Sequence, residues 1–504
     1  MIQVRDLTII QRINGRALTS KLSFTLNDGE KAVIIGEEGN GKSTLLRCIF
    51  EPQSIDSYAE CSGDFLLNGN RLGYLPQQLP EADAKKSVAD YLAFSAETQR
   101  RLAGLMEELG LDLDLRFETR PLETLSGGEK VKLQLVRLLL DEPDVLLLDE
   151  PTNDIDLQTL MWLEDFLAAC PQAVLFVSHD ETLIENVADM VIHLEQLHTK
   201  KECRHTVAHL PYRAYIDERR SSFKRQEQLA RKEKAQFEAR MERYQRIFER
   251  VQHEQRTISR GNPSGGRLLK KKMHSVKAMG ARFEKEKQKM TKLPVMEQPI
   301  FLSLPETFIP PAKEVLNLEL PELRAGDRLL AKDIRLLVRG GAHIGIFGDN
   351  GVGKTTLLRH IERSISASGR FECFYMPQNY LEQLPTGINA VEFLAPSGSK
   401  DEVTRARTYL GSLKFTRDEM TSPIGRLSGG QRAKLYFLNM ALKERQVLVL
   451  DEPTRNFSPL SNPVIRGVLS EFRGAIISVS HDRKYLTEVC DTLYRLTRDG
   501  LVLQ

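Results

Sequence analysis

An internal repeat constrains this chain more than any other feature, because one ordered set of five short segments occurs twice. The first copy consists of Gly36–Ser43 (GEEGNGKS), Tyr74–Gln77 (YLPQ), Leu125–Glu129 (LSGGE), Val145–Thr152 (VLLLDEPT) and Ser178–Asp180 (SHD). The second consists of Gly348–Thr355 (GDNGVGKT), Tyr375–Gln378 (YMPQ), Leu427–Gln431 (LSGGQ), Val447–Thr454 (VLVLDEPT) and Ser480–Asp482 (SHD). In both copies, 24 residues separate the first Leu of the third segment from the Asp of the fourth, and 30 separate that Asp from the His. The repeat predicts two copies of one domain of about 200 residues.

Each copy has the pattern of an α/β domain. Apolar runs at 31–35 and 342–347 stop at a glycine, and helical patterns follow from Ser43 and Thr355. Further apolar runs lie at 145–148, 174–177, 447–450 and 476–479, and such runs are typical of strands buried on both faces of a parallel sheet. We therefore expect an α/β fold of two phosphate-loop domains.

The segment between the copies has a different composition. Residues 213–292 contain 24 Lys or Arg and 10 Asp or Glu, a net charge of +14, and since the whole chain has +2, the rest carries −12. Apolar residues recur every seven positions at 216, 223, 230, 237, 244 and 251, with Met241 and Phe248 between them, and no Gly or Pro occurs from 213 to 260. After Gly261–Gly266, helical spacing resumes at Val276, Met279, Phe283, Met290 and Leu293. These patterns predict a long helical hairpin.

The tip of this hairpin, residues 255–277, has no acidic residue. Its basic residues are Arg256, Arg260, Arg267, Lys270, Lys271, Lys272 and Lys277. Their charge suits these seven residues to bind a phosphate backbone, since Lys and Arg neutralise backbone phosphates, and the family resemblance given below implies that this partner is RNA. A solvated basic coiled coil is the alternative interpretation.

The predicted domains are residues 1–199, 200–300 and 301–504. The longest apolar stretch without charge, 166–178, has 13 residues and contains Pro171, which is short of the roughly 20 needed to span a bilayer. No secretory signal is recognisable, so we expect a cytoplasmic protein without a membrane domain. The six cysteines are at least 13 residues apart, which argues against a disulfide framework or a zinc site and predicts free thiols.

Gly-x-x-x-x-Gly-Lys-Ser/Thr between a strand and a helix predicts a cradle of backbone N–H groups for phosphate. Glycine is needed because a Cβ would block the approach of the phosphate. Lys42 and Lys354 are expected to reach the terminal phosphates, with Ser43 and Thr355 on Mg²⁺. The predicted nucleotide-binding residues of the two loops are Gly36, Glu37, Glu38, Gly39, Asn40, Gly41, Lys42, Ser43 and Thr44, and Gly348, Asp349, Asn350, Gly351, Val352, Gly353, Lys354, Thr355 and Thr356.

Acidic pairs follow one apolar run in each copy. Asp149 and Asp451 end predicted strands, where a carboxylate can hold Mg²⁺ through water. The next residues, Glu150 and Glu452, are then placed to orient or deprotonate an attacking water. The sequence predicts ATP hydrolysis with Mg²⁺ as cofactor.

Together these segments resemble the ATP-binding cassette ATPases, with both cassettes on one chain, and Leu-Ser-Gly-Gly-Glu/Gln is the family's signature motif. The resemblance implies that Ser126, Gly127 and Gly128 bind the nucleotide of the second phosphate loop, and Ser428, Gly429 and Gly430 that of the first. It also implies that Gln77 and Gln378 sense Mg²⁺ and water, and that His179 and His481 contact the γ-phosphate as catalytic residues. The chain would then be a monomer whose cassettes pair with each other.

Two departures from the family pattern are visible. The windows where relatives carry an adenine-stacking aromatic hold Thr8–Ile13 and Asn317–Pro321, neither with an aromatic residue. Many relatives have Asn-His-Leu-Asp after Glu-Pro-Thr. The first copy has Asn153-Asp-Ile-Asp156, but the second has Arg455-Asn-Phe-Ser458. We therefore expect loose base selectivity and unequal hydrolysis at the two sites.

Two functions are compatible with paired cassettes and no membrane domain. One is the ATPase subunit of an importer with separate membrane chains, but such subunits usually have a degenerate second phosphate loop and a short linker. The other is the ABC-F family, which this chain resembles over essentially its whole length. That resemblance implies ribosome binding, with the basic linker near rRNA and the P-site tRNA.

Within the ABC-F family, the sequence favours one branch. From Gln77 to Leu125 is 48 residues and from Gln378 to Leu427 is 49, which leaves no room in the first copy for the extra arm of many housekeeping members. The chain also ends 23 residues after His481. It thus resembles the antibiotic-resistance members, which protect the peptidyl-transferase region, and a housekeeping translation factor is the alternative.

Overall fold

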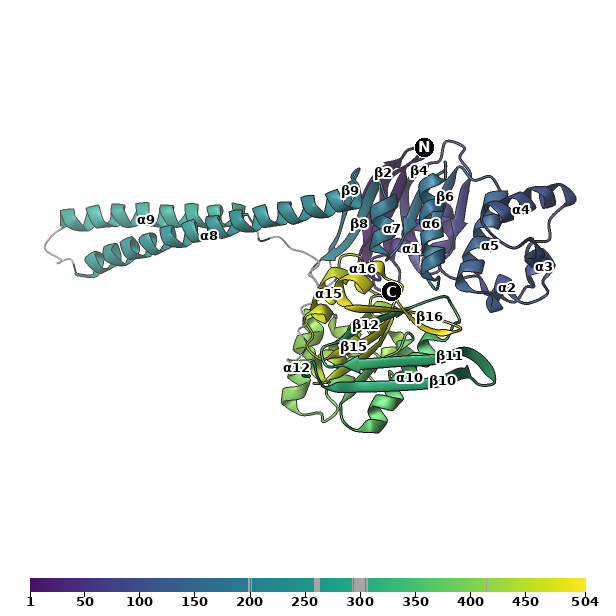
Figure 1. The fold of residues 1–504 in the computed structure, drawn as a ribbon. Coiled ribbons are helices and arrows are strands. Elements are labelled where there is room, and N and C mark those ends of the chain that lie inside the picture. Colours follow the sequence, from purple (N-terminus) through teal and green to yellow (C-terminus); the bar gives the residue numbers. More distant parts are fainter. Residues whose placement is uncertain are drawn as a thin grey trace. The chain divides into compact units, whose positions relative to one another are not determined.

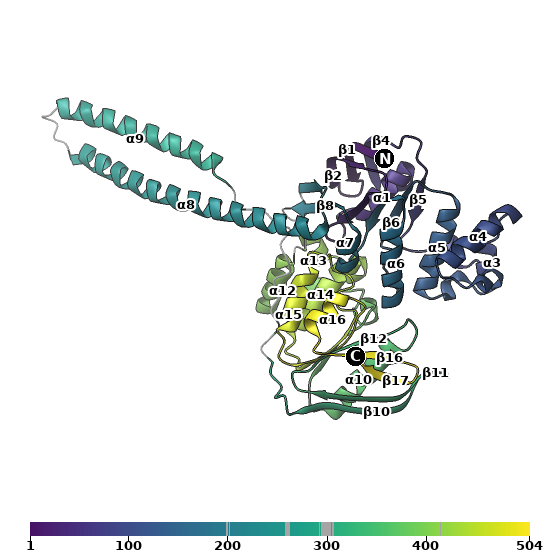
Figure 2. The same cartoon turned by 45° about the horizontal axis from the view of Figure 1, so that its top comes forward.

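A computed structural model of the chain describes residues 1–197, 200, 202–257, 263–291, 293, 304, 307–413 and 415–504. They form two compact units, one of Met1–Tyr212 with Glu297–Gln504 and the other of Arg213–Met296. The first unit contains two α/β cassettes, and the second is a helical hairpin (Figures 1 and 2). This confirms the predicted fold class.

The first cassette is built on a six-stranded sheet in the order β5-β6-β7-β3-β8-β9, parallel except for β9. Its strands are β3 (Lys31–Ile35), β5 (Leu72–Leu75), β6 (Val145–Asp149), β7 (Ala173–Val177), β8 (Met190–Leu197) and β9 (Glu202–Ala208). A separate antiparallel sheet contains β1 (Ile2–Gln11), β2 (Ala17–Leu26) and β4 (Ala59–Leu66). The helices are α1 (Lys42–Phe50), α2 (Glu81–Ala84), α3 (Val88–Tyr91), α4 (Ala96–Glu108), α5 (Gly127–Leu140), α6 (Leu157–Ala169) and α7 (Glu181–Val187).

The second cassette repeats this sheet in the order β13-β14-β15-β12-β16-β17. Its strands are β12 (His343–Phe347), β13 (Cys373–Met376), β14 (Val447–Asp451), β15 (Ala475–Val479), β16 (Thr492–Thr497) and β17 (Gly500–Leu503), with β10 (Glu314–Ala325) and β11 (Arg328–Arg339) as an antiparallel pair. Its helices are α10 (Lys354–Ser368), α11 (Ala390–Leu394), α12 (Lys400–Ser412), α13 (Arg417–Thr421), α14 (Gly429–Leu442), α15 (Asn462–Ser470) and α16 (Arg483–Val489). The apolar runs found in the sequence are the central strands.

These central strands are buried at every position of β3, β6, β7, β14 and β15. A strand covered on both faces needs apolar residues throughout, which is why each of these segments reads as a continuous run rather than an alternation. The carboxyl ends of β6 and β14 bring Asp149 and Asp451 to the same sheet edge as the phosphate loops that follow β3 and β12. The predicted first domain ends at residue 199, but β9 lies beyond that point and pairs with β8.

The hairpin consists of α8 (Tyr212–Thr257) and α9 (Pro263–Lys289). The 46 residues of α8 extend over about 69 Å at 1.5 Å per residue. The predicted turn covers residues 261–266, of which 261 and 262 lie outside the described residues. The second helix, α9, already begins at Pro263. Proline suits the first turn of a helix, where its missing N–H is not needed. The helical spacing predicted for the second helix extends to Leu293, but α9 ends at Lys289.

Aromatic and aliphatic side chains join α8 to α9. Phe237 and Tyr244 both pack edge-on against Phe283, and Val251 is buried with Met273 and Val276. Met279 is exposed, because the row of α9 that faces α8 passes from Val276 to Phe283 through Gly280, where a Cβ would lie 2.5 Å from the Tyr244 hydroxyl. Leu293 is also exposed, since it lies beyond the end of α9.

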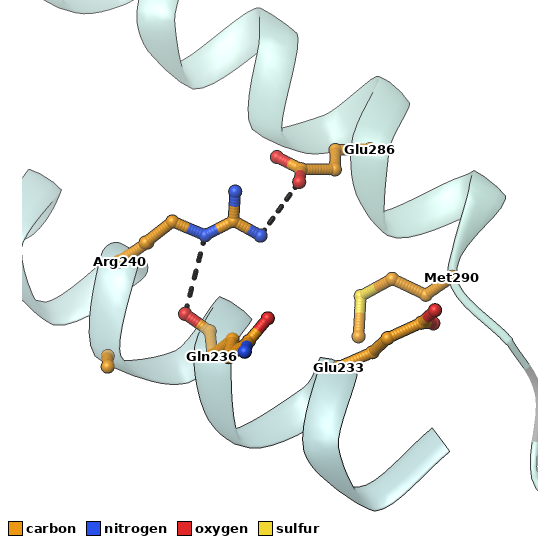
Figure 3. Close-up of a pocket in the computed structure, with 6 residues that line it drawn as sticks. Glu233, Gln236, Arg240, Glu286 and Met290 are labelled. Carbon is orange, nitrogen blue, oxygen red and sulfur yellow. Dashed lines mark hydrogen bonds and ion pairs between the residues drawn. The ribbon is translucent and has the colours of Figure 1, made fainter. Parts of the chain in front are cut away.

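A polar contact crosses the same seam near its other end (Figure 3). Arg240 on α8 forms an ion pair with Glu286 on α9 at 2.7 Å and also donates to the Gln236 carbonyl at 3.4 Å. Glu233 on α8 accepts from the backbone N–H of Thr291 at 2.7 Å. Apolar packing and these contacts together give the hairpin its register.

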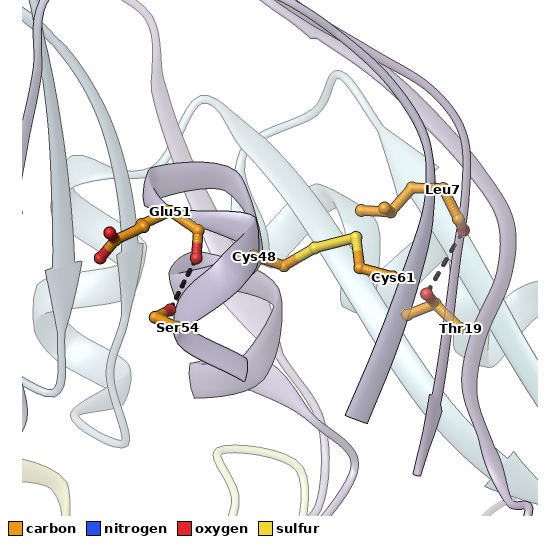
Figure 4. Close-up of a disulfide and its surroundings, with 6 residues drawn as sticks. All are labelled: Leu7, Thr19, Cys48, Glu51, Ser54 and Cys61. Carbon is orange, nitrogen blue, oxygen red and sulfur yellow. Dashed lines mark hydrogen bonds between the residues drawn. A yellow bond between two sulfur atoms is a disulfide. The ribbon is translucent and has the colours of Figure 1, made fainter. Parts of the chain in front are cut away.

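One prediction about the cysteines is wrong. Cys48 on α1 and Cys61 on β4 form a disulfide (Figure 4), whereas Cys170, Cys203, Cys373 and Cys490 are free thiols as expected. The pair is 13 residues apart in sequence, but the chain turns back after α1 so that β4 runs beside the helix. Spacing alone could not reveal this contact, which depends on how α1 packs on the sheet. In the described part of the chain, no helix is both long and apolar enough to span a membrane.

Candidate nucleotide-binding sites

The two phosphate loops have backbones that only glycine can adopt. Gly36 has φ 146°, and a Cβ there would lie 2.3 Å from the Leu194 carbonyl oxygen; at Gly348, with φ 155°, the corresponding distance to Leu496 is 2.5 Å. Gly41 and Gly353, which precede α1 and α10, have left-handed φ values of 92° and 106°. Side chains are therefore excluded at these positions in both loops, and such a backbone suits the close approach of a phosphate group. Phosphate binding by the loops stays a prediction.

The lysine of each loop points back over the loop. Lys42 Nζ donates to the Gly36 carbonyl at 2.8 Å, and Lys354 Nζ donates to Gly348 at 2.7 Å. Burial lowers the pKa of Lys354 from its usual value, although nearby carboxylates counteract the shift. Each loop thus combines backbone donors with an ammonium group beside them.

A hydroxyl and a carboxylate meet at the first residue after each lysine. Ser43 Oγ donates to Asp149 at 2.8 Å and Thr355 Oγ1 donates to Asp451 at 2.7 Å. Burial raises the pKa of Asp149, and that of Asp451 to about 6. Hard oxygen ligands of this kind suit Mg²⁺ shared with nucleotide phosphates, where the protein contributes one or two ligands rather than a full cage. Consistently, no cluster of three or more His, Cys, Asp or Glu suited to a metal occurs among the residues described.

Each cassette also pairs a glutamate with a histidine. His179 Nε2 lies 2.8 Å from Glu150 Oε1, and His481 Nε2 lies 3.5 Å from Glu452 Oε1. Both glutamates have φ 52°, a left-handed conformation that is costly for a residue with a side chain and concentrates at functional sites. Their backbone N–H groups donate to Val177 and Val479 of the neighbouring strands, which holds the glutamates in place.

The two pairs differ in electrostatics. Burial raises the pKa of Glu150, but His179 and Lys42 outweigh it, so the pKa is lowered overall. Burial dominates at Glu452 and raises its pKa to about 7, and burial lowers the pKa of His481 to about 4. Glu150 Oε2 and the Nδ1 atoms of both histidines are buried without a hydrogen-bond partner, so Glu150 Oε2 can accept from a water and each Nδ1 can hydrogen-bond to a bound water or ligand.

The two signature segments begin α5 and α14. Ser126 and Ser428 are the N-caps, and each forms a capping box with the residue three positions on, Glu129 or Gln431. The N–H of Gly430 donates to Glu38 of the first phosphate loop, so the structure brings the second signature to the first loop. A Cβ on Gly127 would meet the Asp154 carbonyl at 1.8 Å.

The second phosphate loop meets the first cassette through the segment after Glu150. Asn350 Nδ2 donates to the Asp154 carbonyl at 2.8 Å, and the Asn350 N–H donates to Asp156 at 3.4 Å. Arg455 forms an ion pair with Asp154 at 2.7 Å. Residues of both cassettes therefore surround each phosphate loop.

Two of the predicted residues have few contacts, and one relevant residue was missed. Gln77 and Gln378 are exposed just beyond β5 and β13. Tyr74, in the same segment as Gln77, donates its hydroxyl to Asp149 at 3.2 Å and accepts from Arg47 at 3.3 Å. The recurrence of Tyr in both copies of that segment was a signal for this contact.

A cavity of about 740 Å³ lies beside the second phosphate loop. Its lining includes Arg328 and Lys332 of β11 and Arg498, together with residues 349–352 of the loop. None of the described lining residues is aromatic, in keeping with the missing aromatic residue in the sequence.

At the hairpin tip, basic side chains face solvent. Arg256, Arg267, Lys270–Lys272 and Lys277 are exposed, whereas Arg260 lies outside the described residues. Ion pairs of the hairpin occur at Arg231, Lys234, Arg240 and Arg246, away from these tip residues. The charge of the tip is thus available to a polyanion.

Fold and site together define a pair of phosphate-loop cassettes built for a nucleoside triphosphate. A family model described as "ABC transporter" matches residues 19–153 and 331–455, which is more than half of the chain, and the protein belongs to this family. The ABC domains bind ATP.

Relatives that span nearly the whole chain are ABC-F proteins. "Ribosome protection protein VmlR" of Bacillus subtilis (strain 168) is 29% identical, over 100% of this chain and 86% of its own length. "Probable ATP-binding protein YheS" of Escherichia coli (strain K12) is 28% identical, over 95% of this chain and 76% of its own length. Among solved structures, the archaeal ribosome recycling factor aABCE1, in complex with the ribosomal stalk protein aP1, aligns with a TM-score of 0.60 at 15% identity, over 98% of this chain and 89% of that one, and so shares the fold.

Proposed function

We propose that this protein is a ribosome-binding ATPase of the ABC-F type that hydrolyses ATP with Mg²⁺ and protects the ribosome from antibiotics. The observation that carries ribosome binding is a hairpin whose tip presents exposed Lys and Arg without a carboxylate. VmlR, a relative over the full length of the chain, is named a ribosome protection protein, which supports the protective role.

Hydrolysis is assigned to the two Glu–His pairs. Glu150 and Glu452 orient and deprotonate the attacking water, while His179 and His481 hold the glutamates and contact the γ-phosphate. Lys42 and Lys354 bind the β- and γ-phosphates. The hydroxyl–carboxylate pairs Ser43–Asp149 and Thr355–Asp451 would hold Mg²⁺, and the ion would neutralise charge on the phosphates. The Ser and Gly of each signature complete the site on the opposite cassette, so the chain works as a monomer with paired cassettes.

The hairpin is assigned to RNA. A helix of about 69 Å can carry its tip deep into a ribonucleoprotein, where the tip residues contact rRNA and the P-site tRNA near the peptidyl-transferase region. We keep the division into two cassettes and a linker that was predicted at residues 1–199, 200–300 and 301–504, with the first boundary moved past β9, which pairs with β8. We place the protein in the cytoplasm, where ribosomes are found. The short segments between each Gln and signature support a resistance member over a housekeeping one.

Co-sedimentation with ribosomes tests this proposal. The Glu150→Gln, Glu452→Gln double variant should bind ATP normally, lose ATPase turnover by about 100-fold or more, and pellet with 70S ribosomes in ATP but not in ADP. The wild-type protein in ADP is the matched control. If the double variant stays in the supernatant with ATP, the ribosomal function is wrong, and unchanged turnover would remove the glutamates from the reaction.

A further inference from the structure

The first phosphate loop carries two carboxylates that are inserted among donors of the second cassette. Glu37 accepts from Lys434 Nζ at 2.6 Å, from Ser461 Oγ at 2.6 Å and from Ser458 Oγ. The Glu37 and Lys434 side chains are only 15% and 18% exposed. Burial alone would raise the pKa of Glu37, but Lys434 and the two hydroxyls hold it well below its usual range, so Glu37 is ionised.

Glu38, the next residue, occupies an anion-binding position. Its carboxylate accepts from the N–H of Gly430 at the start of α14, and a Cβ on Gly430 would lie 2.7 Å from the Glu38 carboxyl group. A helix N-terminus with a free N–H attracts negative charge, which is the property that suits the signature segment to a phosphate. Here the Gly430 N–H donates to the Glu38 side chain of the protein itself.

The other phosphate loop lacks this arrangement. The positions of Glu37 and Glu38 are taken there by Asp349 and the neutral Asn350, and Asp349 pairs with Arg495 of its own cassette at 3.5 Å. Counted from Asp451 and Asp149, Ser458 corresponds to Asp156 and Lys434 to Lys132.

The partners have changed accordingly. Asp156 accepts from the Asn350 N–H at 3.4 Å, and Lys132 lies over the Trp162 ring at 4.3 Å instead of reaching the opposite cassette. At the second loop, the carboxylate of this contact is Asp156 of the opposite cassette. At the first loop, the carboxylate is Glu37 of the loop itself, and the opposite cassette supplies Ser458. Ser458, in the segment Arg455–Ser458 that departs from the family pattern, is smaller than an aspartate and donates to Glu37.

We propose that Glu37 and Glu38 form an autoinhibitory contact: they tie the first phosphate loop to the second cassette, and the γ-phosphate of ATP must displace Glu38 from Gly430 to bind at the first site. At the second site the corresponding residue is the neutral Asn350, which cannot compete as an anion. This inference rests on the proposed ATP binding, and it makes the two sites unequal at the binding step.

Hydrogen exchange in nucleotide-free protein tests the contact directly. A hydrogen-bonded amide exchanges only when the bond opens, so Glu38→Ala should speed exchange of the Gly430 amide, in a peptide covering 427–433, by about tenfold or more. Asn350→Ala, at the position of the second loop that corresponds to Glu38, is the matched control and should leave exchange of the Gly430 amide unchanged. Glu38→Asn, which installs the residue of the second loop, serves as a second variant in case alanine perturbs the loop.

Equilibrium binding of ATP supplies a second readout. In a Lys354→Ala background, which confines ATP to the first site, Glu38→Ala should tighten ATP binding by about tenfold and ADP binding much less, because the γ-phosphate is the group that faces the signature segment. Unchanged Gly430 exchange, or ATP affinity that is equal or weaker in the variant, would overturn the inference. Neither measurement involves ribosomes, and failure of the Lys354→Ala protein to bind any ATP would instead count against the proposed ATPase.

Discussion

Single residues explain why the two repeated sites are not equivalent. His179 contacts Glu150 at 2.8 Å, but His481 lies 3.5 Å from Glu452, and the pKa values of the two glutamates shift in opposite directions. The same motif residues therefore have different pKa values in the two copies, because their burial and their neighbouring charges differ.

Asp180, which is beside His179, allows the effect of burial on the pKa of a carboxylate to be tested at one residue. It caps α7 by accepting from the Leu183 N–H at 2.6 Å, and burial, with repulsion from Asp482, raises its pKa from 3.8 to about 6. The folded protein thus binds a proton that the unfolded chain releases near pH 4, so the stabilising contribution of Asp180 is present below about pH 4 and is lost as pH rises through 6.

Asp180→Asn should therefore increase the free energy of unfolding by about 2 kcal/mol at pH 8, since asparagine keeps the cap without a buried charge. At pH 4 the gain should disappear. Urea unfolding at both pH values measures the difference, with Asp64→Asn on the surface of β4 as control. A gain that is equal at pH 4 and pH 8 would contradict this account.

At the scale of an element, the residues that pack α8 against α9 differ from the residues that carry the charge of the hairpin tip. Tyr244, Val251, Met273 and Phe283 lie in the seam between α8 and α9, while Lys270–Lys272 are exposed. Replacing the three lysines should therefore leave the hairpin folded. Its effect should fall on binding to a polyanion.

We expect Lys270→Ala, Lys271→Ala and Lys272→Ala together to weaken ribosome binding and to flatten its dependence on log salt, by about 0.7–0.9 for each phosphate that the tip no longer neutralises. Binding measured from 50 to 300 mM KCl checks this. The control replaces Lys224, Arg225 and Lys232, which are exposed in the first part of α8, and makes the same charge change. If both triple variants flatten the slope equally, net charge rather than the tip governs binding.

At the scale of the whole molecule, a buried ion-pair network joins the two cassettes. Arg466 on α15 is 3% exposed and pairs with Glu181 on α7 at 2.7 and 3.2 Å, and Lys484 on α16 also reaches Glu181. Charges taken out of water are tolerated here because each has a partner.

Arg466→Met should lower the free energy of unfolding by about 3 kcal/mol, because Glu181 would be left without its bidentate partner while staying buried. Adding Glu181→Met should recover part of that stability, since it removes the buried carboxylate that has lost its arginine and keeps only Lys484 as a partner. Urea unfolding of the single and double variants gives the comparison. A double variant less stable than Arg466→Met would show that the network stabilises the cassettes beyond charge pairing.

Much of the fold was predictable from local patterns. The strands 31–35, 145–148 and 447–450 were expected within one residue of their observed bounds, because a strand buried on both faces must be apolar throughout. The glycines of the phosphate loops, whose backbone excludes a Cβ, were equally visible. The hairpin was predicted by its heptads and by the spacing of apolar residues in its second helix, but that spacing does not say which of two adjacent rows faces the partner helix, and Met279 is exposed.

The sequence by itself determined the two cassettes, the residues of the phosphate loops and the segregation of positive charge onto the hairpin, because each depends on residue types at short spacing. The tertiary structure alone decided the Cys48–Cys61 disulfide, the contact of Glu37 with Lys434 and the burial of Arg466 against Glu181. Glu37 and Lys434 are 397 positions apart, and Arg466 and Glu181 are 285 apart. No local sequence pattern predicts such pairs, since the residues become buried and come close to each other only when the cassettes pack.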